Sequence, residues 1–271
     1  MNILFWNCQR IVNRRTRHAL KMLIQKHRIN LVVLSETHCT KEQHQSLRRS
    51  IGLPHIAHFD CVERAGGLAL LWDDSISVRV QDVERYYVDA YIQAPNEVEW
   101  RFTGFYGHPE TGQCHLSGNL LRSLARNPGD LWVVAGDFNE ILELGEKSGG
   151  RVRSQGQMQA FQDALSDCNL KDMGSTRGLY TWSDSNTKER LDRGTCTPTW
   201  LSEFGFSRVV NLHPSRSDHI PLLLEVRKEQ MCHEKLRCQF RFEEMWCAHG
   251  GFSAKVEEAW STPYGGEPML Y

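Results

Sequence analysis

Polar residues that could do chemistry follow an apolar run in the middle of the chain. Residues 131–136 read Leu-Trp-Val-Val-Ala-Gly, with Asp137 and Asn139 close behind. Such a run is typical of a strand that is buried on both faces. If the backbone stays extended, Asp137 and Asn139 point the same way and face one spot. The alternative is an ordinary buried strand that ends in a turn, because Asp and Asn both favour turns.

Similar polar side chains stand at the ends of other predicted strands: Asn7, Glu36, Tyr106 and Asp218. A histidine, His219, and a further aspartate, Asp192, complete the set. Carboxylate and amide oxygens are the ligands that Mg²⁺ and Mn²⁺ prefer. A cation of this kind neutralises charge on a phosphoryl group, a carboxylate activates water, and a histidine held by an aspartate donates to the phosphate. The set indicates hydrolysis of a phosphate ester. Taken singly, each member has a structural alternative; Asp192, between Arg190 and Arg193, could form a surface ion pair.

Two apolar strands with a helix between them open the chain. The strands are predicted over residues 2–8 and 30–36. An amphipathic helix is predicted over residues 17–28, with Thr16 as its N-cap. This order predicts parallel pairing in an α/β or layered α+β domain.

The chain up to residue 226 is otherwise rich in predicted strands. Apolar runs and alternating patterns predict them over residues 68–72, 76–80, 86–94, 98–106, 131–136, 179–182, 209–212 and 220–226. Helices are predicted over residues 115–126 and 157–167, and the glycine-rich segment 145–157 predicts a mobile loop. We therefore expect an α+β fold in which a two-sheet β-sandwich is flanked by helices.

The composition suits a globular domain and excludes several classes of protein. Hydrophobic residues make up 40% and charged residues 24% of the chain, which are ordinary proportions. No apolar run approaches the roughly 20 residues of a membrane span. The N-terminal apolar run is too short for a signal peptide, and no basic residues precede it. The nine cysteines are scattered without a Cys-x-x-Cys pair, so neither a cysteine zinc module nor a disulfide framework is expected. We expect thiols in a reducing, intracellular compartment.

Charge is distributed unevenly along the chain. Residues 1–59 contain ten Lys or Arg and two Asp or Glu, whereas residues 60–150 contain seven and fifteen. A basic first segment suits a polyanionic partner. Its candidate nucleic-acid contacts are Arg10, Arg14, Arg15 and Arg17. The alternative is a solvated helix face with scattered positive charge.

Six short motifs resemble those of the endonuclease/exonuclease/phosphatase superfamily, which has the DNase-I-like fold. They run in order over residues 2–226: Ile3-Leu4-Phe5-Trp6-Asn7-Cys8, Leu34-Ser35-Glu36-Thr37, Phe105-Tyr106-Gly107, Gly136-Asp137-Phe138-Asn139, Arg190-Leu191-Asp192 and Ser217-Asp218-His219. The resemblance implies a four-layer α/β/β/α arrangement and a hydrolase that depends on Mg²⁺ or Mn²⁺.

The resemblance also implies a role for each residue. Glu36 would ligate the metal with Asn7 close by, and Asp218 would contribute to metal or water binding. The catalytic residues would be Asp137, Asn139, His219, Asp192 and Tyr106. Asp137 would activate the attacking water, and Asn139 would help to hold that geometry. His219, oriented by Asp192, would contact the scissile phosphate, to which Tyr106 would also donate.

Within the superfamily, the chain looks most like the endonuclease domain of plant non-LTR (LINE-type) retrotransposons. Three motifs carry this likeness: Tyr180-Thr181-Trp182-Ser183, Ser217-Asp218-His219-Ile220-Pro221-Leu222 and Phe240-Arg241-Phe242-Glu243-Glu244-Met245-Trp246. We expect a nuclease domain over residues 1–228 and a tail or linker over residues 229–271. No reverse transcriptase follows, so the chain is expected to be a truncated reading frame or a stand-alone derivative.

Three functions are consistent with the sequence. The first is a DNA endonuclease that nicks one strand and leaves a 3′-hydroxyl. The second is a phosphodiesterase or phosphatase that acts on RNA, nucleotides or inositol phosphates, because the fold hosts all of these activities. The third is a non-catalytic retroelement remnant that binds nucleic acid. We expect a monomer that acts on DNA, with RNA as the alternative, and that binds no membrane; acting on genomic DNA would require a nuclear location.

Overall fold

The computed structural model describes residues 1–62, 66–126, 129–213 and 217–228, together with positions 251, 252, 254, 257 and 261. The chain divides into two compact units, Met1–Gln230 and Met231–Tyr271. Most of the expected tail, including the aromatic motif at residues 240–246, lies outside the described residues. No described helix is long and apolar enough to span a membrane.

One six-stranded sheet of the first unit contains the two strands that open the chain. Its strands, in spatial order, are β14 (Arg208–Asn211), β15 (Leu222–Glu225), β1 (Asn2–Asn7), β2 (Leu31–Ser35), β4 (Leu68–Trp72) and β3 (His55–Phe59). β1 and β2 pair in parallel, as predicted, and the other pairs are antiparallel.

The second six-stranded sheet contains the strand that leads to Asp137. Its strands, in order, are β10 (Lys171–Asp172), β13 (Asp192–Cys196), β8 (Trp132–Asp137), β7 (Trp100–Tyr106), β6 (Tyr87–Gln93) and β5 (Ser77–Val83). β7 and β8 pair in parallel. A small third sheet joins β11 (Trp182–Ser183), β12 (Lys188–Glu189) and β9 (Lys147–Ser148).

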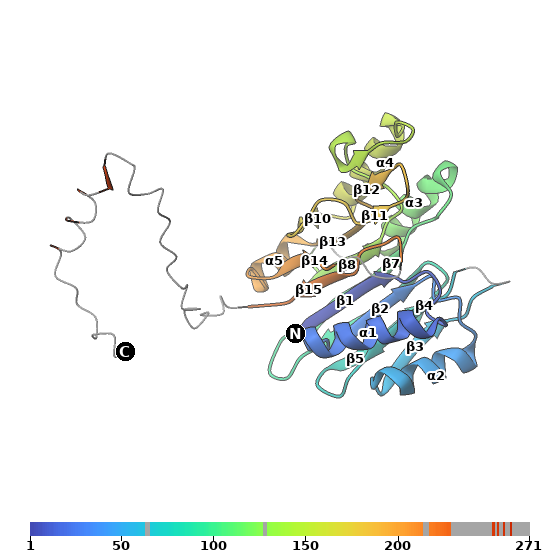
Figure 1. Cartoon of the computed structure of the whole chain (residues 1–271). Helices are drawn as coiled ribbons and strands as arrows, with labels where there is room; N and C mark the ends of the chain where they lie inside the picture. Colours follow the sequence, from blue (N-terminus) through green and yellow to red (C-terminus); the bar gives the residue numbers. More distant parts are fainter. Residues whose placement is uncertain are drawn as a thin grey trace. The chain divides into compact units, whose positions relative to one another are not determined.

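Helices cover the outer faces of the two large sheets. α1 (Arg14–His27) and α2 (Lys41–Ile51) lie over the sheet that contains β1, and α3 (Cys114–Leu124) and α4 (Gln155–Asp167) lie beside β8 (Figure 1). A short helix α5 (Pro198–Glu203) and two 3₁₀ turns, η1 (Thr111–Gln113) and η2 (Leu144–Glu146), complete the described elements.

Strand alternation sorts the core into layers. Ile3 and Phe5 of β1 point between the sheets, where the ring of Phe5 lies 5.6 Å from that of Phe102. Leu4 and Trp6 point the other way, toward α1 and α2. Each buried side chain of this kind stabilises the fold by about 1.5–3 kcal/mol. The predicted four-layer α/β/β/α arrangement is therefore confirmed.

Local geometry corrects three predictions. α1 starts at Arg14, because the Asn13 side chain accepts from the backbone N–H of Arg15 at 2.9 Å and caps the helix; Thr16 is buried inside the helix, so its predicted capping role is wrong. The expected loop at 145–157 contains part of η2, all of β9 and the start of α4. The strand predicted at 179–182 is confined to Trp182–Ser183.

Candidate active site

Two parallel strand pairs, one in each large sheet, bring the predicted residues to the site. Asn7 ends β1 opposite Ser35, and Glu36 follows directly. Tyr106 ends β7 opposite Asp137 at the end of β8. Asp192 opens β13 and pairs with Asp137 from the other side.

The Asn7 amide joins residues from both sheets. Its Nδ2 donates to Glu36 Oε1 at 3.2 Å and to Asp137 Oδ2 at 3.0 Å, and it lies 3.4 Å from His219 Nε2. Asn7, Asp137 and His219 are buried. We call Asn7, Glu36, Asp137, Asp192 and His219 the strand-end cluster.

His219 lies between two carboxylates. Its Nδ1 lies 2.8 Å from Asp192 Oδ2, and its Nε2 lies 3.8 Å from Asp137 Oδ2. Burial opposes the charged imidazole, but the Asp192 and Asp137 charges outweigh it and raise the pKa of His219 to about 10. Burial also raises the pKa of Asp137 to about 7, in spite of the opposing His219 charge. The site thus holds a cationic donor beside a carboxyl group that can exchange a proton near neutrality.

Tyr106 contacts Glu36 in this structure. Its hydroxyl donates to Glu36 Oε1 at 2.7 Å, and burial together with the Glu36 charge raises its pKa far above the usual range. Tyr106 is therefore a neutral donor. Glu36 itself leaves β2 with a left-handed φ of 51°, a strained conformation that is common at functional sites.

Asn139 does not continue the strand. Its φ is 55°, its backbone N–H donates to Asp137 Oδ1 at 2.9 Å, and its Nδ2 donates to the Gly107 carbonyl at 2.9 Å. The extended geometry that would make Asp137 and Asn139 face one spot is wrong, and the turn is right. The turn fixes one Asp137 oxygen while Asn7 holds the other.

Asp218 lies beside the cluster with its oxygens engaged. Its Oδ2 accepts from Gln9 Nε2 and from Trp182 Nε1, both at 2.8 Å. Its negative charge adds to the rise in the pKa of His219. In this structure Asp218 is held by protein donors.

Two hydroxyl groups that position the cluster were not singled out from the sequence. Thr181 Oγ1 accepts from the backbone N–H groups of Leu191 and Asp192, at 3.0 and 2.9 Å. Ser217 Oγ donates to the Asn7 carbonyl at 2.8 Å and accepts from the His219 N–H at 3.1 Å. Both lie inside quoted motifs, but their roles depend on backbone groups distant in sequence.

The arginines beside Asp192 are buried in a network of their own. Arg193 contacts Glu146 at 2.8 Å and Asp172 at 2.7 Å, and Arg190 contacts the same two acids. Burial opposes ionisation of Glu146, but the Arg193 hydrogen bond and charge lower its pKa overall. The alternative of a surface ion pair for Asp192 is wrong, and its carboxylate is left for His219.

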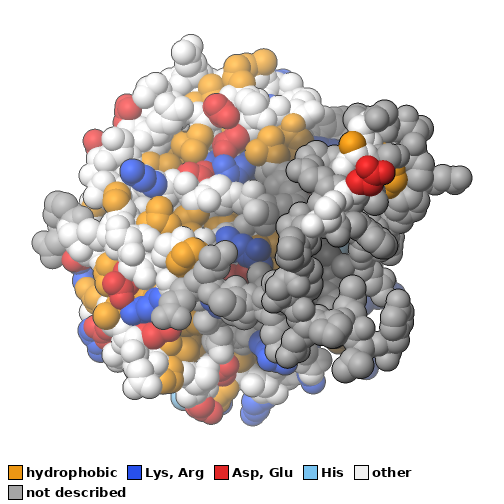
Figure 2. Space-filling model, turned by 90° about the vertical axis from the view of Figure 1, so that its left-hand side faces the viewer, with side chains coloured by type: hydrophobic (Ala, Val, Ile, Leu, Met, Phe, Trp, Pro, Cys, Tyr) orange, Lys and Arg blue, Asp and Glu red, His pale blue; other side chains and the backbone are white. Residues whose placement is uncertain are grey.

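The four predicted nucleic-acid contacts lie at or after the end of β1. Arg10, Arg14 and Arg15 are exposed, and Arg17 is half-buried with its Nε donating to the Ile11 carbonyl at 3.1 Å. The Arg10 backbone N–H donates to the Glu36 carbonyl at 2.8 Å. On the face shown in Figure 2, Lys and Arg are scattered among acidic and apolar side chains.

The donor set of the cluster fits a hard divalent cation. Single ligand atoms of Asp137, Asp192 and His219 lie within 4.8 Å of one another, but Asp192 and His219 Nδ1 contact each other directly. Glu36, which is half-buried, and Asp137 offer carboxylate oxygens on either side of the Asn7 amide. Rotating the Asn7 side-chain amide by half a turn would present its oxygen in place of its nitrogen. Burial is the main cause of the raised pKa of Asp137, and the negative charge of Asp192 adds to it.

The family model described as Endonuclease/Exonuclease/phosphatase matches residues 4–220. The chain belongs to this family. Membership supports a nuclease-like phosphodiesterase, in agreement with the chemistry of the cluster. A search of curated proteins found no sequence that matches the chain.

Solved structures share the fold at low sequence identity. An AP endonuclease from Leishmania major is 12% identical, with a TM-score of 0.69 and coverage of 84% of this chain and 88% of that one. The endonuclease domain of TRAS1, a telomere-specific non-LTR retrotransposon, is 16% identical, with a TM-score of 0.61 and coverage of 84% and 99%. The 3′ phosphatase NExo from Neisseria, bound to a product DNA hairpin, is 19% identical, with a TM-score of 0.62 and coverage of 83% and 99%.

Proposed function

We propose that the chain is a DNA endonuclease that uses Mg²⁺ or Mn²⁺ to nick one strand of a duplex. The observation that carries the proposal is the strand-end cluster, in which one Asn7 nitrogen contacts Glu36, Asp137 and His219. This arrangement supports the proposal because a base (Asp137), a cationic donor (His219) and a carboxylate ligand (Glu36) would all adjoin the Asn7 amide.

The proposed reaction assigns one task to each residue. Asp137 accepts a proton from water, whose oxygen forms a bond to phosphorus while the bond to the 3′ oxygen breaks. The His219 Nε2–H donates to a phosphoryl oxygen as negative charge builds, with Asp192 fixing the ring through Nδ1. The Tyr106 hydroxyl donates to Glu36, so it must break that hydrogen bond before it can donate to the phosphate. The released 3′ oxygen takes a proton from solvent, so the nick is left with a 3′-hydroxyl and a 5′-phosphate.

The metal would be held mainly by Glu36, with Asn7 close by and Asp218 contributing through water. When bound, it would neutralise charge on the phosphoryl oxygens and the leaving group. Asn139 would hold the Asp137 carboxylate in place.

We favour DNA as the substrate for two reasons, the exposed arginines near the end of β1 and the structural neighbours. The exposed Arg10, Arg14 and Arg15 suit a phosphate backbone better than a small ester. The neighbours include a retrotransposon endonuclease domain and an enzyme bound to a DNA hairpin. We further propose that the nuclease domain spans residues 1–228, that residues 229–271 form a tail, and that the chain derives from a LINE-type retrotransposon.

A supercoiled-plasmid assay tests the proposal. We expect Mg²⁺-dependent conversion to open circles, blocked by EDTA and reduced by ~100-fold or more in Asp137→Ala and His219→Ala. The control is Asp163→Ala, on the exposed face of α4. Nicking that resists EDTA or both active-site changes contradicts the mechanism. Cleavage of RNA or small phosphate esters without nicking supports the second function, and salt-sensitive DNA binding without cleavage supports the third.

A further inference from the structure

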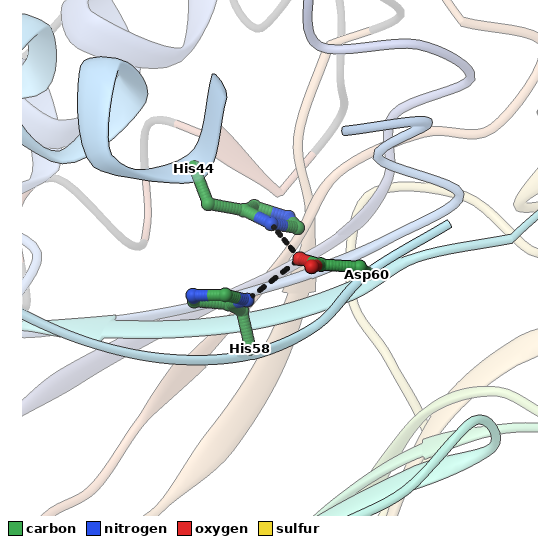
Figure 3. A group of neighbouring side chains, drawn as sticks. All are labelled: His44, His58 and Asp60. Atoms are coloured by element: carbon green, nitrogen blue, oxygen red, sulfur yellow. Dashed lines mark hydrogen bonds and ion pairs between the residues drawn. The ribbon is translucent and has the colours of Figure 1, made fainter. Parts of the chain in front are cut away.

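A second group of potential metal ligands shares no residue with the strand-end cluster. His44 belongs to α2, His58 belongs to β3, and Asp60 follows β3. One ligand atom from each lies within 4.8 Å of the other two. Figure 3 shows both imidazole rings contacting the Asp60 carboxylate, one from the helix and one from the strand.

The distances within this group match the spacing of ligands around one ion. Asp60 Oδ1 lies 3.2 Å from His44 Nδ1 and 2.9 Å from His58 Nδ1. With metal–ligand bonds of about 2.0–2.1 Å, two ligands at tetrahedral to right angles stand roughly 2.9–3.4 Å apart. Asp60 Oδ1 therefore already lies at ligand spacing from each imidazole, and the two rings, which stack with their centroids 4.5 Å apart, would turn toward a shared cation.

His58 supplies an independent observation that points to a ligand. Its Nδ1 is buried and has no hydrogen-bond partner among the described residues. The Asp60 oxygen is near, but it lies off the direction in which an Nδ1–H would point. Leaving such a buried atom without a partner destabilises the folded chain. A cation on its lone pair would remove that cost.

His44 is prepared to act as a neutral ligand. It is fully buried, and its Nδ1 lies 3.2 Å from Asp60 Oδ1. Its Nε2 lies 3.1 Å from Thr37 Oγ1. With the proton on Nε2 and donated to Thr37 Oγ1, the Nδ1 lone pair would bind the cation in place of the hydrogen bond to Asp60, which is the usual arrangement of a ligating histidine.

We propose that His44, His58 and Asp60 bind one Zn²⁺ ion, with water completing a tetrahedral shell. Imidazole nitrogen favours zinc over Mg²⁺. The Asp60 side chain is 44% exposed, so solvent can reach the fourth position. The ion would fasten α2 to the end of β3 and, through Thr37, stabilise the segment that carries Glu36.

Metal titration under conditions that occupy the oxygen site tests this proposal. Protein stripped with EDTA and returned to excess Mg²⁺ is titrated with Co²⁺, followed by Zn²⁺. We expect one equivalent of Co²⁺ with visible d–d bands that Zn²⁺ abolishes. His58→Ala and Asp60→Asn should each weaken binding by at least the ~10–100-fold that outer-shell changes cost. Zn²⁺ should raise the melting temperature of the wild type but of neither of these two variants.

Two controls make the result specific. His55→Ala removes another histidine of β3, which contacts Asp74 at 2.7 Å on the exposed surface, and it should leave the bands unchanged. Glu36→Gln should also keep them. Loss of the bands in Glu36→Gln would assign the ion to the other cluster, and bands that are absent in the wild type or survive both His58→Ala and Asp60→Asn overturn the proposal. Asp60→Asn alters a partly exposed side chain, so the test does not rely on a buried substitution.

Discussion

At the scale of single residues, the fold favours the protonated form of Asp137, whereas the proposed reaction uses its carboxylate. Its ordinary pKa of 3.8 is raised to about 7. Between these values the folded chain keeps a proton that the unfolded chain has lost, so stability falls as pH rises from about 4 to about 7. A bound cation would reverse this preference by favouring the carboxylate.

Asp137→Asn should therefore stabilise the metal-free protein above neutral pH. Asparagine carries no charge to desolvate, so urea unfolding in EDTA at pH 8 should show a gain on the order of 2–4 kcal/mol. At pH 4 the gain should shrink, and plasmid nicking should be lost at every pH. Asp163→Asn, on the exposed face of α4, should change neither property. A loss of stability at pH 8 would show that Asp137 is ionised without cost.

Asp192→Asn should lower the pKa of His219, because the Asp192 charge is the largest influence that raises it. The rate of nicking should then fall by ~100-fold or more, with the larger loss at alkaline pH, where the imidazolium loses its proton. NMR titration of the His219 ring and rates at pH 6.5 and 9 measure both effects. Asp218→Asn provides the comparison and should shift the pKa less. An unchanged pKa in Asp192→Asn would contradict the assigned pair.

Residue types at strand ends could be predicted from the sequence, but their contacts could not. Asn7, Glu36 and Asp137 follow apolar runs, which mark them as polar groups at a sheet edge. That the Tyr106 hydroxyl contacts Glu36, and that Asn139 turns back to Gly107, depends on the register between strands. No local pattern specifies such a register.

At the scale of elements, β11 and the residue before it hold two segments of the site. The Thr181 backbone N–H donates to the Glu189 carbonyl, and its carbonyl accepts from the Ile220 N–H. Its side-chain hydroxyl accepts from the backbone N–H groups of Leu191 and Asp192. Thr181 thereby ties the start of β13 to the residue that follows His219.

Thr181→Val should disturb the site by removing only the hydroxyl. Two buried N–H groups would lose their acceptor, at a cost of about 1–3 kcal/mol each. We expect nicking to fall by ~10-fold or more and the pKa of His219 to fall with it, because Asp192 moves. Thr181→Ser keeps the hydroxyl and should restore both values. If Thr181→Val leaves both values unchanged, the hydroxyl does not hold the segment.

Long elements could be predicted better than short ones. β1, β2 and β8 were predicted from apolar runs, and α3 and α4 from helical spacing. The two-residue strands β9 and β12 contain charged residues and are set by pairing alone. No element is predicted for residues 37–65, although Thr40 and Gln43 form a capping box at the start of α2.

At the scale of the whole molecule, the positive charge at the start of α1 should affect DNA binding more than it affects the rate of hydrolysis. Reversing Arg14 and Arg15 to Glu should weaken DNA binding and make its dependence on salt shallower. The slope of log K against log salt should decrease by about 0.9 for each DNA phosphate that the variant no longer neutralises. Hydrolysis of a small diester should not change.

The same charge change farther along α1 provides the control. Lys21 and Lys26 are exposed on later turns, and reversing both should affect the slope less. Equal slopes for the two double variants would show that the start of α1 has no special contact with the backbone of DNA.

The order of the chain has a consequence for protein synthesis. Asn7 and His219 are separated by 212 positions, and β15, which follows His219, pairs with β1. A nascent chain on the ribosome lacks the His219 imidazole and one of the two strands that pair with β1 until nearly the whole domain has been made. A translation product that ends before His219 therefore cannot assemble the strand-end cluster, and any activity that depends on the cluster arises only when the domain is nearly complete.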